Sequence, residues 1–144
     1  MVSAVIFVAT SCVSPLTGFA FWETNLAYEG ESVYNYLQVK ETEDSVILST
    51  NVLFGVQSVK QKDGGLTGMY YDTALAAPTL ADNANSALIL GMGTGTYARQ
   101  LKQYYPKMNI TGVEIDQKIT DLAGEYFDEP ADIPVTTYDG RAWL

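Results

Sequence analysis

The fold of this chain is decided by the stretch LILGMGTGT at residues 88–96. The apolar run at 87–90 predicts a short buried strand, and the residues after the glycines predict a helix over 97–105. Glycine lets the backbone turn tightly and approach a ligand closely, while a helix N-terminus offers free N–H groups and the positive end of its dipole. This order favours a nucleotide-binding turn over an ordinary strand-to-helix connection.

The spacing of the glycines helps to choose the nucleotide. A dinucleotide fingerprint would place its third glycine at position 96, where this chain has Thr96. The glycines stand instead at alternate positions, Gly91, Gly93 and Gly95. We associate this form with sites for S-adenosylmethionine-type nucleosides.

Strands and helices alternate after this stretch. A second strand is predicted over 110–115, a helix over 117–127 and a third strand over 133–138. This alternation predicts an α/β fold built of βαβ units with a parallel sheet, and a strand, glycine turn and helix in this order serve nucleotides in both dinucleotide-binding (Rossmann-like) and S-adenosylmethionine-type methyltransferase sheets. Upstream, apolar runs between 34 and 59 predict a small antiparallel β-region, and the segment 67–80 is predicted to be helical.

Acidic residues follow two of the predicted parallel strands. Glu114 is a candidate to accept hydrogen bonds from the ribose hydroxyls, because its apolar neighbours should point to the opposite face of the strand. Asp116 is expected to cap the following helix. Asp139 is a candidate partner for an adenine amino group, with Gly140 allowing the base to approach.

The first 22 residues carry no charged side chain. Their length predicts a membrane helix over 1–22. Two alternatives stay open: a secretory signal, although the basic n-region is missing, and a buried element of the domain, since Pro15 would kink a helix.

Composition excludes several kinds of chemistry. The chain has no histidine and a single cysteine, Cys12, which removes Ser-His-Asp and Cys-His systems and imidazole or thiolate zinc sites. The net charge of −9 argues against a nucleic-acid partner, because phosphate binding needs clustered Lys and Arg. A cationic or neutral small molecule fits that charge better, although an acidic surface usually serves solubility.

The segments LILGMGTGTYARQL (88–101), ITGVEIDQKITDLAGEYF (110–127) and TYDGRAWL (137–144) resemble spermidine synthase and its aminopropyltransferase relatives. They resemble in particular the bacterial branch that is fused to membrane helices. Two upstream segments, ESVYNYLQV (31–39) and GLTGMYYD (65–72), extend the resemblance, which covers about residues 23–144.

This resemblance implies a transferase that moves an aminopropyl group from decarboxylated S-adenosylmethionine to an amine or polyamine, without a metal. It assigns the glycine loop and Glu114 to the cofactor's nucleoside, with Asp139 and Gly140 on the adenine side. Two alternatives remain: a small-molecule methyltransferase that uses S-adenosylmethionine, and a membrane-tethered nucleoside-binding module without catalysis.

Some positions depart from the family pattern. Tyr71 resembles a substrate-side tyrosine, but Asp72 stands where the family usually has histidine. We therefore take both as candidate substrate-binding residues, and Asp72 as the one candidate base. The family's own base is expected on a strand beyond Leu144. The parent protein is thus expected to be an enzyme, and this chain alone to be inactive.

The predicted organisation is a transmembrane helix at 1–22, a small antiparallel β-region at 23–66 and the first half of a Rossmann-like cofactor-binding domain at 67–144. The predicted location is the inner (plasma) membrane, with the α/β domain in the cytoplasm. The expected partner is a small-molecule amine, and the resemblance also allows a homodimer.

Overall fold

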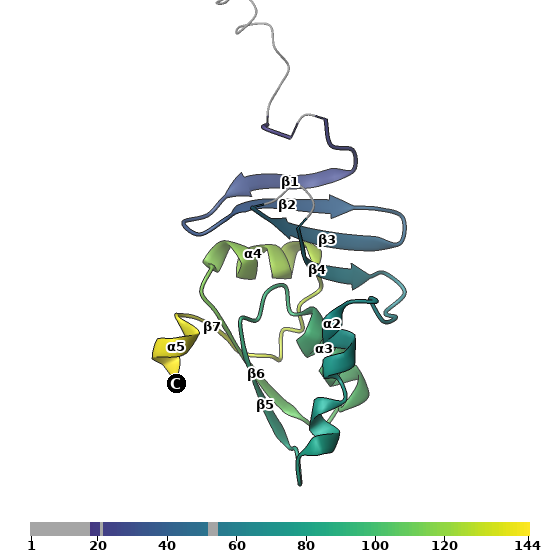
Figure 1. Cartoon of the computed structure of the whole chain (residues 1–144), viewed down its shortest axis with the longest axis vertical. Coiled ribbons are helices and arrows are strands. Elements are labelled where there is room, and N and C mark those ends of the chain that lie inside the picture. Colours follow the sequence, from purple (N-terminus) through teal and green to yellow (C-terminus); the bar gives the residue numbers. More distant parts are fainter. Residues whose placement is uncertain (1–17, 21, 52–54) are drawn as a thin grey trace, which may run out of the picture.

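The computed structural model describes residues 18–20, 22–51 and 55–144. Its N-terminal part is a four-stranded antiparallel sheet in which neighbouring strands follow one another in sequence (Figure 1). The strands are β1 (Leu26–Glu31), β2 (Tyr36–Glu41), β3 (Ser45–Thr50) and β4 (Val56–Gln61). The predicted antiparallel β-region is therefore present.

A second sheet contains three parallel strands in the order β5-β6-β7. Its strands are β5 (Ser86–Leu90), β6 (Asn109–Glu114) and β7 (Val135–Thr137). The helices that follow them are α3 (Thr96–Tyr104), α4 (Gln117–Tyr126) and α5 (Gly140–Trp143). The register pairs Leu90 with Val113 and Glu114 with Thr137, so the carboxyl ends of the strands meet at one edge. This arrangement confirms the predicted fold class.

Helix α4 links the two sheets. Its buried residues Ile119 and Leu122 share a core with Leu37 and Leu48 of the antiparallel sheet, and Phe127 at the end of α4 is fully buried there. Figure 1 shows α4 lying along the antiparallel sheet, between it and the parallel strands. The sheet therefore buries its apolar face against an element of the α/β part.

The two faces of the parallel sheet differ. Ile89 packs with Ala98 and Leu101 of α3 in a second core. Leu88 and Leu90 alternate with Ile89 and so point the other way, where they remain 40% and 43% exposed. Gly140, the first residue of α5, lies beside the Leu90 side chain on that more open side.

Local differences from the prediction have physical causes. The helix expected over 67–80 is divided into α2 (Tyr70–Ala74) and a 3-10 turn, η1 (Ala77–Leu80), because Pro78 supplies no N–H to continue an α-helix. Strand β1 was not predicted, and β7 is shorter than the range 133–138. The last apolar run of the predicted antiparallel β-region covers 52–59, and its first three residues, 52–54, lie outside the described part of the chain.

The membrane helix predicted over 1–22 falls mostly on residues outside the described part. Among the residues that the structure describes, none of the helices has the length and apolar composition needed to cross a bilayer.

Candidate functional site

The glycine loop after β5 has the backbone conformation that its sequence predicts. Gly91, Gly93 and Gly95 have φ angles of 80°, 59° and 73°, in the left-handed region that other residues rarely adopt. The backbone N–H groups of Gly91 and Met92 both donate to the carbonyl of Val113, at 2.9 and 3.0 Å. These bonds hold the loop against the end of β6.

Glu114, the last residue of β6, is buried beside that loop. Its Oε2 accepts a hydrogen bond from the backbone N–H of Gly93 at 2.8 Å, and its Oε1 accepts one from the N–H of Asp116 at 3.0 Å. A carboxylate has about four acceptor positions, so both oxygens can still accept hydroxyl donors. The two backbone bonds fix the direction in which those acceptors point.

Asp116 caps helix α4, as predicted. Its Oδ1 accepts a 3.0 Å hydrogen bond from the backbone N–H of Lys118. The side chain is almost fully buried, at 2% exposure. Asp116 is therefore a structural acid, and Glu114 is the carboxylate that remains available at this strand end.

Asp139 and Gly140 lie just after β7. Asp139 caps α5 by accepting a 2.8 Å hydrogen bond from the backbone N–H of Arg141, and its side chain is otherwise exposed. A Cβ placed on Gly140 would come within 3.4 Å of Cδ2 of Leu90. The absence of a side chain at Gly140 thus keeps the space beside Leu90 open.

A cavity of about 630 Å³ opens at the carboxyl edge of the parallel sheet. It is lined by Leu90, Gly91, Val113, Glu114, Ile115, Asp139, Gly140, Arg141 and Leu144. The structure thus brings together four candidate residues from the ends of all three strands: Gly91, Glu114, Asp139 and Gly140. Gly93 and Gly95 shape the loop but do not line this strand-end cavity.

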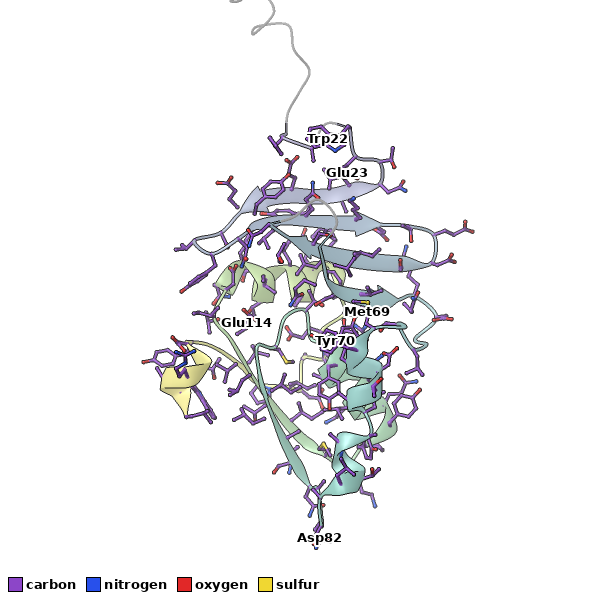
Figure 2. The ribbon with its side chains drawn as sticks, viewed as in Figure 1. Trp22, Glu23, Met69, Tyr70, Asp82 and Glu114 are labelled. Atoms are coloured by element: carbon purple, nitrogen blue, oxygen red, sulfur yellow. The ribbon has the colours of Figure 1, made fainter. Side chains whose placement is uncertain are left out.

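A second, smaller cavity of about 220 Å³ adjoins the first, since Leu90 and Gly91 line both. Its walls come from β4, α2, β5 and the start of α3, including Gln57, Tyr70 and Tyr71. We call it the loop cavity. Figure 2 shows Glu114 and Tyr70 at the level where the two sheets meet.

Tyr71 and Tyr70 have different roles in the loop cavity. The Tyr71 hydroxyl accepts a 2.9 Å bond from the N–H of Val59 and donates to its carbonyl at 3.4 Å, and burial raises the pKa of this phenol. The hydroxyl of Tyr71 is therefore fixed by hydrogen bonds to the backbone of β4. Tyr70 is 78% exposed, with its ring 5.1 Å from that of Tyr71. The sequence reasoning missed Tyr70, although the Tyr-Tyr pair was the visible signal.

Asp72 is held by hydrogen bonds from three residues. Its carboxylate accepts hydrogen bonds from Gln100 Nε2 at 2.8 Å, from the N–H and hydroxyl of Thr67 at 2.8 and 2.9 Å, and from the N–H of Gly68 at 2.6 Å. Burial acts to raise its pKa, but these bonds outweigh burial and hold the pKa of Asp72 below its ordinary value. Asp72 lines neither cavity, so this geometry gives no support to a role as base or substrate ligand.

Gln57 is a further residue that the sequence left unassigned. It lines the loop cavity, and a Cβ on Gly93 would lie only 2.8 Å from its Nε2. Its Oε1 accepts a hydrogen bond from the Ser58 hydroxyl. Gln57 therefore brings an amide from the antiparallel sheet directly against the glycine loop.

The fold and this site define the class of the protein. A three-stranded parallel sheet, a glycine loop and an acid at the end of the second strand form an incomplete Rossmann-like sheet of the S-adenosylmethionine-type methyltransferase kind. No protein-family model matches the chain.

Comparison with individual proteins finds a relative that is similar in sequence and solved structures that are similar in fold. A probable polyamine aminopropyl transferase of Bifidobacterium longum is 92% identical over 144 residues, which are 100% of this chain and 32% of that protein. A probable spermidine synthase from Corynebacterium glutamicum superposes with a TM-score of 0.66 at 22% identity, over 83% of this chain and 47% of the other. A spermidine synthase in complex with the transition-state analogue AdoDATO superposes with a TM-score of 0.65 at 18% identity, over 83% of this chain and 42% of the other.

These findings confirm the resemblance to spermidine synthase and its aminopropyltransferase relatives. The two solved structures contribute the likeness of fold, and the Bifidobacterium longum protein contributes the likeness of sequence. The chain spans about a third of the length of that relative.

Proposed function

We propose that this chain supplies the nucleoside-binding part of an aminopropyltransferase that uses decarboxylated S-adenosylmethionine and a small-molecule amine or polyamine. The observation that carries the proposal is the strand-end cavity, in which Glu114 and Asp139 face one space beside the glycine loop. The name and high identity of the Bifidobacterium longum relative support the choice of reaction.

In this proposal, the strand-end cavity takes the nucleoside. Glu114 accepts hydrogen bonds from the ribose diol with the lone pairs that its two backbone donors leave free. Asp139 lies on the adenine side, where Gly140 leaves room for the base beside Leu90. The loop cavity, which has Leu90 and Gly91 as lining residues in common with the first cavity, takes the aminopropyl group and the amine.

The transfer itself is a substitution at carbon. The amine nitrogen attacks the aminopropyl carbon next to the sulfonium, the C–N bond forms, the C–S bond breaks, and methylthioadenosine leaves with the electron pair. The new ammonium then loses a proton to a base. Within the described residues, positioning is the contribution that the geometry supports, through Glu114, Tyr70 and the glycine loop.

The test is calorimetric titration of the protein with methylthioadenosine, S-adenosylhomocysteine and NAD. We expect methylthioadenosine to bind most tightly and NAD not to bind. Tighter binding of S-adenosylhomocysteine would favour the methyltransferase alternative. Binding of methylthioadenosine without aminopropyl transfer by the complete protein would favour the binding module, and no nucleoside binding at all would contradict the proposal.

We also propose that residues 1–22 tether the chain to the inner membrane, with the α/β part in the cytoplasm. The support is the absence of charge from those residues. Membrane fractionation with and without residues 1–22 tests it, and an unchanged distribution would contradict the tether. The homodimer stays a prediction.

A further inference from the structure

Two hairpin turns of the antiparallel sheet have the same local geometry. In the β1–β2 turn, the N–H of Ser32 donates to the carbonyl of Asn35 at 2.8 Å and the N–H of Asn35 donates to the Ser32 hydroxyl at 2.9 Å. In the β2–β3 turn, Thr42 and Ser45 repeat both bonds at 2.9 and 3.0 Å. In both turns the hydroxyl of the first residue therefore accepts the backbone N–H of the fourth residue.

The β1–β2 turn makes an additional long-range contact. The Ser32 hydroxyl donates to Oδ2 of Asp116 at 2.5 Å, and Nδ2 of Asn35 donates to the same oxygen at 3.0 Å. These residues are 84 and 81 positions from Asp116 in sequence. In the described part of the chain, the Thr42 hydroxyl bonds only within its own turn. Closing the turn therefore does not explain the contact with Asp116.

Asp116 connects this turn to the candidate nucleoside site. The hairpin occupies its Oδ2, while its Oδ1 caps α4. Its backbone N–H donates to Oε1 of Glu114, whose Oε2 accepts the N–H of Gly93. A continuous set of hydrogen bonds thus runs from Ser32 and Asn35 through Asp116 to Glu114 and the glycine loop.

We propose that Ser32 and Asn35 are positioning residues that orient Glu114 for the ribose diol by fixing Asp116. This inference rests on the proposed function. Without the two hairpin donors, one carboxylate oxygen of a nearly fully buried Asp116 would have no hydrogen-bond partner. An unpartnered buried acceptor is costly, so the side chain would turn toward water and move the peptide N–H that holds Glu114.

The main experiment compares Ser32→Ala and Asn35→Ala with Thr42→Ala, the matched turn variant. For each protein, the affinities for methylthioadenosine and its 2′-deoxy analogue are measured, together with the free energy of unfolding. We expect the preference for the ribose form to fall about tenfold in the double variant Ser32→Ala/Asn35→Ala. Thr42→Ala should lower stability but keep the full preference.

Two further variants separate positioning from simple destabilisation. Ser32→Thr retains the hydroxyl that Ser32→Ala removes, so this variant should keep the preference for the ribose form. Combining Ser32→Ala with Glu114→Gln should cost less than the sum of the single effects, because both act on the same carboxylate. An unchanged ribose preference in Ser32→Ala/Asn35→Ala, with a stability loss like that of Thr42→Ala, would overturn the proposal.

Amide hydrogen exchange gives a readout that needs no ligand. We expect the N–H groups of Gly93 and Asp116 to exchange on the order of tenfold faster in Ser32→Ala/Asn35→Ala, and at the original rate in Thr42→Ala. Unchanged exchange at both amides would overturn the positioning role. If these amides exchange faster in the double variant but the unsubstituted protein binds no nucleoside, the proposed function is overturned. The hydrogen-bonded connection between the hairpin and Glu114 then still stands.

Discussion

The backbone N–H of Gly93 donates a 2.8 Å hydrogen bond to Oε2 of Glu114, 21 residues further along the chain. This bond joins the loop after β5 to the end of β6, so the conformation of the loop and the direction of the carboxylate are set together. A site that is oriented before the ligand arrives loses less free energy to ordering on binding.

Gly93→Ala should weaken methylthioadenosine binding at least tenfold, about 1.4 kcal/mol. The new Cβ would meet Nε2 of Gln57 at 2.8 Å, and the φ of +59° disfavours any side chain. Both effects displace the loop from Glu114. Calorimetry gives the affinity, and a circular dichroism melt confirms that the variant still folds.

The matched control for that substitution is Gly124→Ala in helix α4. A Cβ there meets no atom within 4 Å, and alanine favours helix, so stability should rise by about 0.5–1 kcal/mol with unchanged binding. Equal affinity losses in the two variants would show that the loop is only a turn.

Glu114→Gln should reduce affinity for the ribonucleoside by about 1.5–3 kcal/mol. Glutamine places an amide donor against the N–H of either Gly93 or Asp116, which removes one of the two bonds that orient the side chain. The 2′-deoxy analogue should lose less affinity than the ribose form. Equal losses for both ligands would contradict the assignment of Glu114 to the ribose.

Asp72→Asn should destabilise the fold by about 1–3 kcal/mol at neutral pH, because an amide cannot accept all the donors from Thr67, Gly68 and Gln100. The folded-state pKa of Asp72 lies below its ordinary value of 3.8, so this stabilisation is present above that pH and is lost as pH falls through the folded pKa. The difference between variant and parent should therefore shrink below about pH 3.8.

Urea unfolding across that pH range measures the effect of Asp72→Asn. Asp121→Asn, at an exposed position of α4, is the control and should change stability by less than about 0.5 kcal/mol. If Asp72→Asn left stability unchanged and abolished turnover in the complete protein, Asp72 would be the base after all.

Glu129→Gln should stabilise the chain by a few tenths of a kcal/mol at neutral pH. Oε1 of Glu129 is buried without a partner among the described residues, and burial raises the pKa of this carboxyl above its ordinary value of 4.5. The contribution of protonated Glu129 to the stability of the fold is fully present below pH 4.5 and is lost as pH rises through the pKa of Glu129 in the folded state. The gain is small because solvent screens a half-buried group.

The same unfolding series across pH tests Glu129→Gln, with the exposed Glu43→Gln as its control. The gain in stability should disappear in acid, because Glu129 of the unsubstituted protein is then protonated and, like glutamine, uncharged. A gain that is constant with pH would mean that charge burial at Glu129 is not its cause.

The strand ends were predictable from the sequence because their signals are local. The apolar run before the alternating glycines indicates a strand and a turn from neighbouring residues alone. In the same way, the apolar neighbours of Glu114 indicate the face of the strand on which its side chain lies. The strand β1 gave no such signal. Its six residues, LAYEGE, include a glycine and two acids, and the strand forms through pairing with β2 along the edge of the sheet.

The remaining parts of the site depend on contacts between distant positions. One of the donors to Asp72 is Gln100, 28 residues away, and local spacing cannot reveal that contact. The exposure of Tyr70 and the burial of Tyr71 depend on the position of β4, because Val59 of that strand forms its hydrogen bond with the hydroxyl of Tyr71. Ser32 and Asn35 read as ordinary turn residues until the chain brings Asp116 beside them.

The core that α4 shares with the antiparallel sheet also dictates an order of assembly during synthesis. Leu37 leaves the ribosome about 90 residues before Phe127, the residue that completes their common core. Until then, the apolar face of the nascent sheet is open to water and to other chains. Contacts so far apart in sequence form slowly, so the apolar face of the sheet stays exposed for longer while the chain is being made.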